Sequence, residues 1–234
     1  MSRGKLIAAY LFGSAGRGQI DDLSDLDILA IVENNQGKVA EVAVTQLIPG
    51  QYAHLKPSIS WYGAARVIEM FRNGELFAWH LYQESVPLFD PSGLLVKLGQ
   101  PAVYKDSLQD MLSFRSILQG IPTQVQNSSV NAAYEAGLVY ICMRNIAMAA
   151  SWLLCEKPDF SRYSIFHLEG MRRCPISIEE FDITMHCRMA SQRGYEPPVE
   201  ATALFIFDIY GRLDPWFDEL EALVIRKTNE AKHA

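Results

Sequence analysis

Residues 12–27 combine residue types that could bind a phosphate and a metal ion. The segment reads FGSAGRGQIDDLSDLD, with a Gly-Ser pair at Gly13 and Ser14 and two aspartates, Asp25 and Asp27, on either side of a leucine. Glycine allows a ligand to approach the backbone, and the hydroxyl of Ser14 can donate a hydrogen bond to a phosphate oxygen. Two adjacent carboxylates repel each other unless one is protonated or a cation lies between them. Mg²⁺ suits such a pair, because it prefers hard oxygen ligands from carboxylates and substrate phosphates.

Two apolar segments predict the strands that position these residues. Residues 6–13, LIAAYLFG, and residues 26–33, LDILAIVE, are continuous apolar runs, as expected for strands buried on both faces of a sheet. The first run ends at Gly13-Ser14 and leads into a short predicted helix. The first N–H groups of a helix have no partner within it, so this junction favours an anion.

Asp25 and Asp27 stand two residues apart at the start of the second predicted strand. Side chains two apart in a strand face the same side, so both carboxylates should converge, with Leu26 and Ile28 on the opposite side. Capping or surface carboxylates are the alternative interpretation, which the apolar run directly after Asp27 disfavours. The spacing therefore predicts a metal site.

The remaining pattern indicates an α+β protein with two domains. In the first domain, residues 1–98, we expect further elements as follows: a helix over 38–48, a third strand over 57–63, helices within 64–85 divided at Asn73-Gly74, and a fourth strand over 86–90. The second domain, residues 102–234, carries apolar residues at helical spacing and is predicted to be all helical, with helices over 105–120, 131–157, 177–192 and about 200–232.

Composition narrows the choice of partners and compartment. The chain has 27 acidic and 21 basic side chains, a net charge of −6, which disfavours extended nucleic acid and would suit a cationic acceptor. Its four cysteines contain no C-x-x-C pair, which argues against a zinc site. With no signal peptide, we expect reduced, mostly buried thiols and a cytoplasmic location. No uninterrupted run of about 18 apolar residues occurs, so no membrane span is expected.

The string GSAGRGQIDDLSDLDI resembles the signature of the DNA polymerase beta-like nucleotidyltransferase superfamily. That signature is a Gly-Ser pair, a variable stretch often containing Arg-Gly, and Ser-Asp-x-Asp at the second strand. The matching residues are Gly13, Ser14, Arg17, Gly18, Ser24, Asp25 and Asp27. The resemblance implies a small mixed sheet with helices, a triphosphate bound by Gly13, Ser14 and Arg17, and Mg²⁺ held by Asp25 and Asp27. Arg17 has a second interpretation, as a solvated side chain on a polar loop.

The third predicted strand departs from that family. Active members usually carry a third carboxylate there, which completes the metal site and can accept the proton of the attacking hydroxyl. In KPSISWYG the residues on the corresponding face are Ser58 and Ser60. His54, Glu69 and Asp22 are the nearest alternatives, although the motif places none of them.

Other polar or aromatic residues have simpler interpretations. His80 lies among aromatic residues on a predicted helix and is expected to be packed or hydrogen-bonded, and Phe71, Phe77, Trp79 and Tyr82 are expected in the core. Arg144 and Asn145 interrupt an apolar helix, so Arg144 should form an ion pair or belong to a site. The helical half is also similar to HEPN domains, but no histidine follows Arg144 until His167, so RNA cleavage is not predicted.

Two functions remain open from the sequence. The first is Mg²⁺-dependent transfer of a nucleoside monophosphate, AMP from ATP, to a hydroxyl of a small molecule or protein, as the resemblance to antibiotic nucleotidyltransferases implies. The second is a catalytically weak or inactive nucleotidyltransferase fold that senses a nucleotide or binds a partner as an antitoxin does. The intact Gly-Ser and Asp-x-Asp favour the first and the missing third carboxylate favours the second. The oligomeric state is open, with a homodimer among the alternatives.

Overall fold

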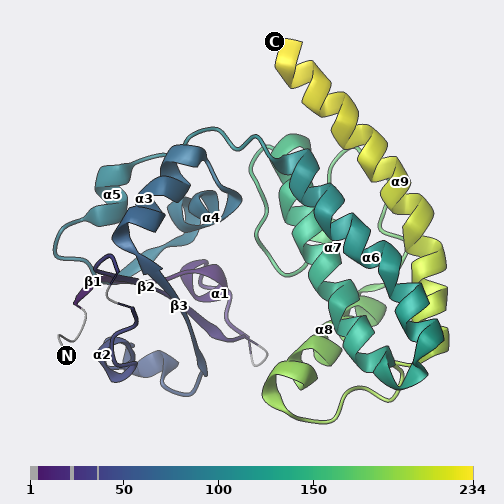
Figure 1. Cartoon of the computed structure of the whole chain (residues 1–234), viewed down its shortest axis with the longest axis horizontal. Helices are drawn as coiled ribbons and strands as arrows, with labels where there is room; N and C mark the ends of the chain where they lie inside the picture. The colour runs from purple at the N-terminus through teal and green to yellow at the C-terminus, as the bar shows by residue number, and fades with distance from the viewer. Residues whose placement is uncertain (1–4, 22–23, 36, 234) are drawn as a thin grey trace. The chain divides into compact units, whose positions relative to one another are not determined.

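The structure is a computed structural model that describes residues 5–21, 24–35 and 37–233, with side chains described up to residue 230. The chain divides into two compact units, the first ending at Lys105 and the second beginning at Asp106 (Figure 1). The first unit combines a sheet with helices. In the described part of the second, only helices and loops occur. The predicted α+β class is therefore confirmed.

Within the described residues, a four-stranded mixed sheet forms the centre of the first unit. The strands are β1 (Leu6–Leu11), β2 (Leu26–Val32), β3 (Pro57–Gly63) and β4 (Val86–Phe89), in the spatial order β3-β2-β1-β4. β1 runs antiparallel to β2 and β4, whereas β3 runs parallel to β2. Because β2 and β3 are parallel, their N-terminal ends lie side by side, next to the predicted aspartates.

Helices cover both faces of this sheet. They are α1 (Gly13–Gly16), α2 (Val42–Thr45), α3 (Ala64–Asn73), α4 (Leu76–Glu84), α5 (Leu94–Leu98) and the 3-10 helix η1 (Gly50–Tyr52). Leu29 and Ile31 of β2 pack in one cluster with residues of α3, α4 and α5. Ile28 and Ala30 pack in another with Ala15 of α1 and residues of α2. β1 and β2 are thus buried on both sides, as their continuous apolar sequences predicted.

Most element predictions in the first unit are confirmed, with one clear exception. The third strand, the fourth strand and the division at Asn73-Gly74 are observed, and Gly74 ends α3 in the left-handed conformation, at φ 68°. The helix expected over residues 38–48 is wrong in length, because only Val42–Thr45 is helical. Its β-branched valines and threonine have low helix propensity, and Pro49 follows.

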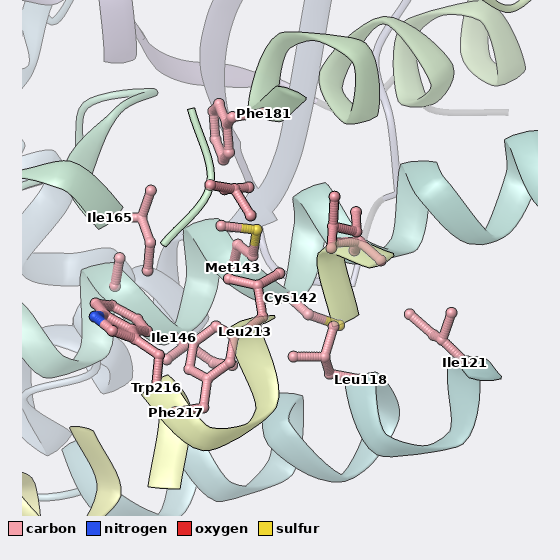
Figure 2. Close-up of a cluster of buried hydrophobic side chains, with 14 of the residues drawn as sticks. Leu118, Ile121, Cys142, Met143, Ile146, Ile165, Phe181, Leu213, Trp216 and Phe217 are labelled. Atoms are coloured by element: carbon pink, nitrogen blue, oxygen red, sulfur yellow. The ribbon is translucent and has the colours of Figure 1, made fainter. Parts of the chain in front are cut away.

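The second unit is a bundle with α7 at its centre. Its elements are α6 (Ser107–Asn127), η2 (Ser129–Asn131), α7 (Ala132–Leu154), η3 (Ser164–Phe166), α8 (Ile178–Arg193) and α9 (Ala203–His233). Figure 2 shows the core, where Cys142, Met143 and Ile146 of α7 lie among side chains of α6 and α9 such as Leu118 and Leu213. All four predicted helices are present. α6 extends beyond the predicted end at Gly120 and through Pro122, since the buried residues Ile121 and Val125 continue its apolar face.

One segment of the described chain, Ser129–Leu154, is long and apolar enough to cross a membrane by length and composition. Core helices of soluble proteins also have this length and composition. In the most apolar 18-residue stretch of this segment, 56% is buried within the structure.

Candidate functional site

Gly13 forms the junction between β1 and α1. Its φ of 65° lies in the left-handed region, which a residue with a side chain adopts only at a cost. A Cβ atom at this position would lie 2.8 Å from Oδ2 of Asp27, closer than van der Waals contact allows. The N–H group of Phe12 also donates to the carbonyl of Asp27 at 3.1 Å. The glycine turn and the Asp27 carboxylate therefore meet at one point, as the phosphate-and-metal hypothesis requires.

Ser14 lies in α1, a single helical turn, and is half-buried. The carbonyl of Gly13 accepts the N–H of Arg17 at 3.0 Å, and the carbonyl of Ser14 accepts the N–H of Gln19 at 2.8 Å. These bonds fold residues 13–19 into a compact turn. The three residues expected to bind the triphosphate thus occupy one short, ordered segment.

Asp25 and Asp27 alternate with buried apolar residues. Both aspartates are half-buried, whereas Leu26 and Ile28 have no exposed surface and belong to the cluster on the α1 and α2 side of the sheet. This alternation agrees with the prediction that the two carboxylates share a side of β2 opposite to Leu26 and Ile28.

A turn at Ser24 directs the chain into β2. The hydroxyl of Ser24 donates to Oδ1 of Asp21 at 2.7 Å and accepts the N–H of Asp21 at 3.2 Å, and the N–H of Ser24 donates to the carbonyl of Asp21 at 3.0 Å. Ser24 is buried. The serine of the Ser-Asp-x-Asp sequence therefore has a structural role, because it stabilises the turn directly before Asp25. Asp22 lies outside the described residues.

The start of β3 brings serines beside the aspartates. Asp27 pairs with Ser58 and Leu29 pairs with Ser60 in the parallel register, so Ser58 is the direct neighbour of Asp27. Among the described residues, no group of three or more His, Cys, Asp or Glu side chains is arranged to hold a metal ion. Asp25 and Asp27 still fit Mg²⁺ if a bound nucleotide supplies further oxygen ligands, because Mg²⁺ is commonly held in this way.

The other groups considered for the third-strand position lie elsewhere in the first unit. His54 is exposed in the loop that precedes β3. Glu69 lies on α3 with 60% of its side chain exposed, and its carboxylate pairs with Arg66 at 3.2 Å. Neither supplies a carboxylate at the register position of Ser58.

Arg17 contacts Glu84, a residue that the sequence analysis did not predict to belong to the site. Its Nη1 donates to Oε2 of Glu84 at 2.6 Å, and its Nε donates to Oε1 of Gln19 at 3.0 Å. The same Glu84 oxygen is 2.8 Å from Nε2 of His80, one helical turn earlier on α4. Arg17 is therefore held by other side chains and is not a freely solvated arginine. Glu84 is 67 positions away in sequence, and no local signal connects it with the Gly-Ser segment.

The carboxylate of Glu84 is charged despite its burial, with 8% of its side chain exposed. Burial raises the pKa of Glu84, but its hydrogen bonds with His80 and Arg17 and the positive charge of Arg17 outweigh burial and leave the pKa below the ordinary value of 4.5. At neutral pH the end of α4 thus presents a fixed negative charge to α1.

His80 is packed and hydrogen-bonded, as expected. His80 is 9% exposed, and its ring makes an edge contact with Phe12 at 5.4 Å between ring centres. Phe71 and Trp79 are buried in agreement with the predicted aromatic core. Tyr82 is an exception, because 47% of it is exposed. Its ring makes an edge contact with Trp79 at 5.9 Å between ring centres.

Arg144 and Asn145 of α7 make contacts with backbone carbonyls. Nη2 of Arg144 donates to the carbonyl of Phe160 at 3.4 Å, and Nδ2 of Asn145 donates to the carbonyl of Ile141 at 2.8 Å. The ion pair considered for Arg144 is not formed among the described residues. His167, the first histidine after Arg144, instead lies 2.8 Å from Asp159, between Nδ1 and Oδ2.

Comparison with models of known protein families finds no match to this chain, and the search of curated proteins finds none either.

Proposed function

We propose that the chain is a Mg²⁺-dependent nucleotidyltransferase that transfers AMP from ATP to a hydroxyl of a small molecule or protein. The observation that carries this proposal is the contact between Gly13 and Asp27, in which a Cβ on the glycine would lie 2.8 Å from the carboxylate. A glycine backbone that can approach phosphate and a carboxylate that can hold a cation are the two groups that nucleotide transfer must bring together.

The residues divide into binding and positioning roles. Gly13 and Ser14 would orient the triphosphate through backbone N–H groups and the serine hydroxyl, and the guanidinium of Arg17 would contact a phosphate oxygen. Asp25 and Asp27 would hold Mg²⁺, which neutralises charge on the phosphates when it is bound. The proposed location is the cytoplasm, because the four cysteines are free thiols and the proposed reaction uses ATP.

The proposed reaction is an in-line displacement at the α-phosphorus. The acceptor hydroxyl oxygen forms a new bond to the α-phosphorus, the bond from that phosphorus to the bridging oxygen breaks, and pyrophosphate leaves. Because Ser58 occupies the position beside Asp27, the hydroxyl proton would pass to solvent water. Loss of a positioned general base typically slows such a step by about 10²–10⁴-fold, so slow turnover is expected.

Ser58 also supports a second candidate, an inactive nucleotidyltransferase fold that binds a nucleotide as a sensor or as part of an antitoxin-like pair. The two candidates differ in their response to a restored carboxylate. Ser58→Asp places an acid beside Asp27 at an exposed position. A weak enzyme should then transfer AMP faster, whereas a sensor that has lost its acceptor site should show tighter Mg²⁺ binding without transfer.

Transfer of label from α-labelled ATP tests the first proposal directly. The chain is incubated with Mg²⁺ and a panel of hydroxyl acceptors, with Asp25→Asn and Asp27→Asn as isosteric variants that remove the charges. Glu75→Gln is the matched control, because Glu75 is an acid of the same unit that pairs with Arg66 on α3. Label transfer by the wild type and the control, and its loss in both aspartate variants, is the expected result. Tight binding of ATP without transfer to any acceptor would refute the enzyme proposal.

A further inference from the structure

Two side chains hold Arg17 in one orientation. Glu84 accepts a hydrogen bond from Nη1 at 2.6 Å and Gln19 accepts one from Nε at 3.0 Å. Within the part of the chain that the structure describes, these two bonds leave Nη2 of Arg17 without a hydrogen-bond partner, and the side chain is 21% exposed. An arginine fixed through Nε and Nη1 in this way offers its remaining N–H groups to a ligand in a defined direction.

Glu84 is itself fixed by two contacts. Its Oε2 atom is shared with Nε2 of His80 at 2.8 Å, on the same helix. Its backbone carbonyl lies against α1 so closely that a Cβ on Gly16 would be 2.0 Å from the carbonyl oxygen. The end of α4 therefore touches α1 through both the backbone and the side chain of Glu84, and α1 also carries Gly13 and Ser14.

We infer that Glu84 is a positioning residue that orients Arg17 toward a phosphate group of the bound nucleotide, and that Gln19 is the second residue that holds Arg17. The inference rests on the proposed nucleotide site. Its physical basis is preorganisation, because an arginine already held in the binding orientation loses less side-chain entropy when the phosphate arrives. Glu84 need not touch the nucleotide, so its effect on binding must act through Arg17.

A double-mutant cycle tests this coupling. Binding of ATP with Mg²⁺ to the full chain is measured by calorimetry for the wild type, Glu84→Gln, Arg17→Gln and the double variant. Glutamine keeps the size of Glu84 and an acceptor for His80 while removing the charge. We expect Glu84→Gln to weaken binding by up to about tenfold, the cost of ordering one long side chain when the phosphate binds. The double variant should bind no more weakly than Arg17→Gln alone, since the two residues act as one unit.

A matched control and an exposed variant complete the design. Glu75→Gln breaks an ion pair with Arg66 of the same length, 2.6 Å, that has no part in holding Arg17, and should leave binding unchanged. Gln19→Ala removes the second support at an exposed position, so it tests the inference even if Glu84→Gln fails to fold. It should weaken binding by a smaller factor and lose that effect in the Arg17→Gln background.

The outcomes separate the inference from the proposed function. If the wild type does not bind ATP with Mg²⁺, the proposed function fails. If the wild type binds but Glu84→Gln and Gln19→Ala bind equally well, or their losses add to that of Arg17→Gln, the positioning role is wrong while the nucleotide site stands.

Discussion

Gly13→Ala should destabilise the first unit for two separable reasons. The first is backbone strain, because Gly13 has a φ of 65°, and a residue with a side chain pays roughly 1–2 kcal/mol in the left-handed region. The second is overlap, because the new Cβ would lie 2.8 Å from Oδ2 of Asp27. Inserting an atom into a filled space typically costs about 1–3 kcal/mol. The sum is about 2–5 kcal/mol, a large part of the stability of an ordinary domain.

Gly18 offers the matched control for this substitution. Its φ is 68°, nearly the same as that of Gly13, yet no atom of the residues that the structure describes lies within 4 Å of a Cβ placed there. Gly18→Ala should therefore lose only the strain component, about 1–2 kcal/mol. The difference between the two variants isolates the contact with Asp27, and adding Asp27→Ala to Gly13→Ala should recover the overlap component.

The assay must report on the first unit alone, because a chain of two units need not unfold in one step. Hydrogen exchange of peptides covering β1 and β2 gives a local free energy of opening for each variant. Equal losses in Gly13→Ala and Gly18→Ala would refute the reasoning, since the carboxylate would then not press on Gly13. Failure of Asp27→Ala to relieve Gly13→Ala would refute it as well.

Two further predictions concern buried titratable groups. Tyr10→Phe removes a hydroxyl that donates to Asp90 and accepts the N–H of Leu95 at 3.3 Å, and should cost about 1–3 kcal/mol by hydrogen exchange of β1. Burial and the hydrogen bond to Asp90 raise the pKa of Tyr10 above its ordinary value of 10.0, so its contribution is complete below pH 10.0 and is lost as the pH rises toward the folded pKa. Denaturation at alkaline pH should show this dependence in the wild type and not in Tyr10→Phe. Alkylation followed by mass spectrometry should modify the half-buried thiols Cys155 and Cys174 before Cys142 and Cys187, which are buried. Burial raises the pKa of Cys142 to about 12 and those of Cys174 and Cys187 to about 11, so solvent access and not acidity distinguishes Cys174 from Cys187. Rapid modification of Cys142 in the folded chain would contradict its burial in the core of the helical bundle.

The local patterns of the sequence predicted most of the elements. Continuous apolar runs marked β1 and β2, the Asn73-Gly74 pair divided α3 from α4, and helical spacing located the four long helices of the second unit. These features depend on side chains a few positions apart, whose periodicity decides which face of an element is buried. The errors, a helix over 38–48 and an end of α6 at Gly120, arose where local propensity and burial disagree.

The sequence could indicate only part of the candidate site. The types and spacing of Gly13, Ser14, Asp25 and Asp27 can be read from one segment, because the chemistry lies within fifteen consecutive residues. Which residues complete the site depends on the pairing of distant segments. Only the parallel register of β2 and β3 places Ser58 beside Asp27, and only the packing of α4 against α1 brings Glu84 to Arg17. Contacts of that separation are set by how whole elements pack, and no periodicity within either segment encodes them.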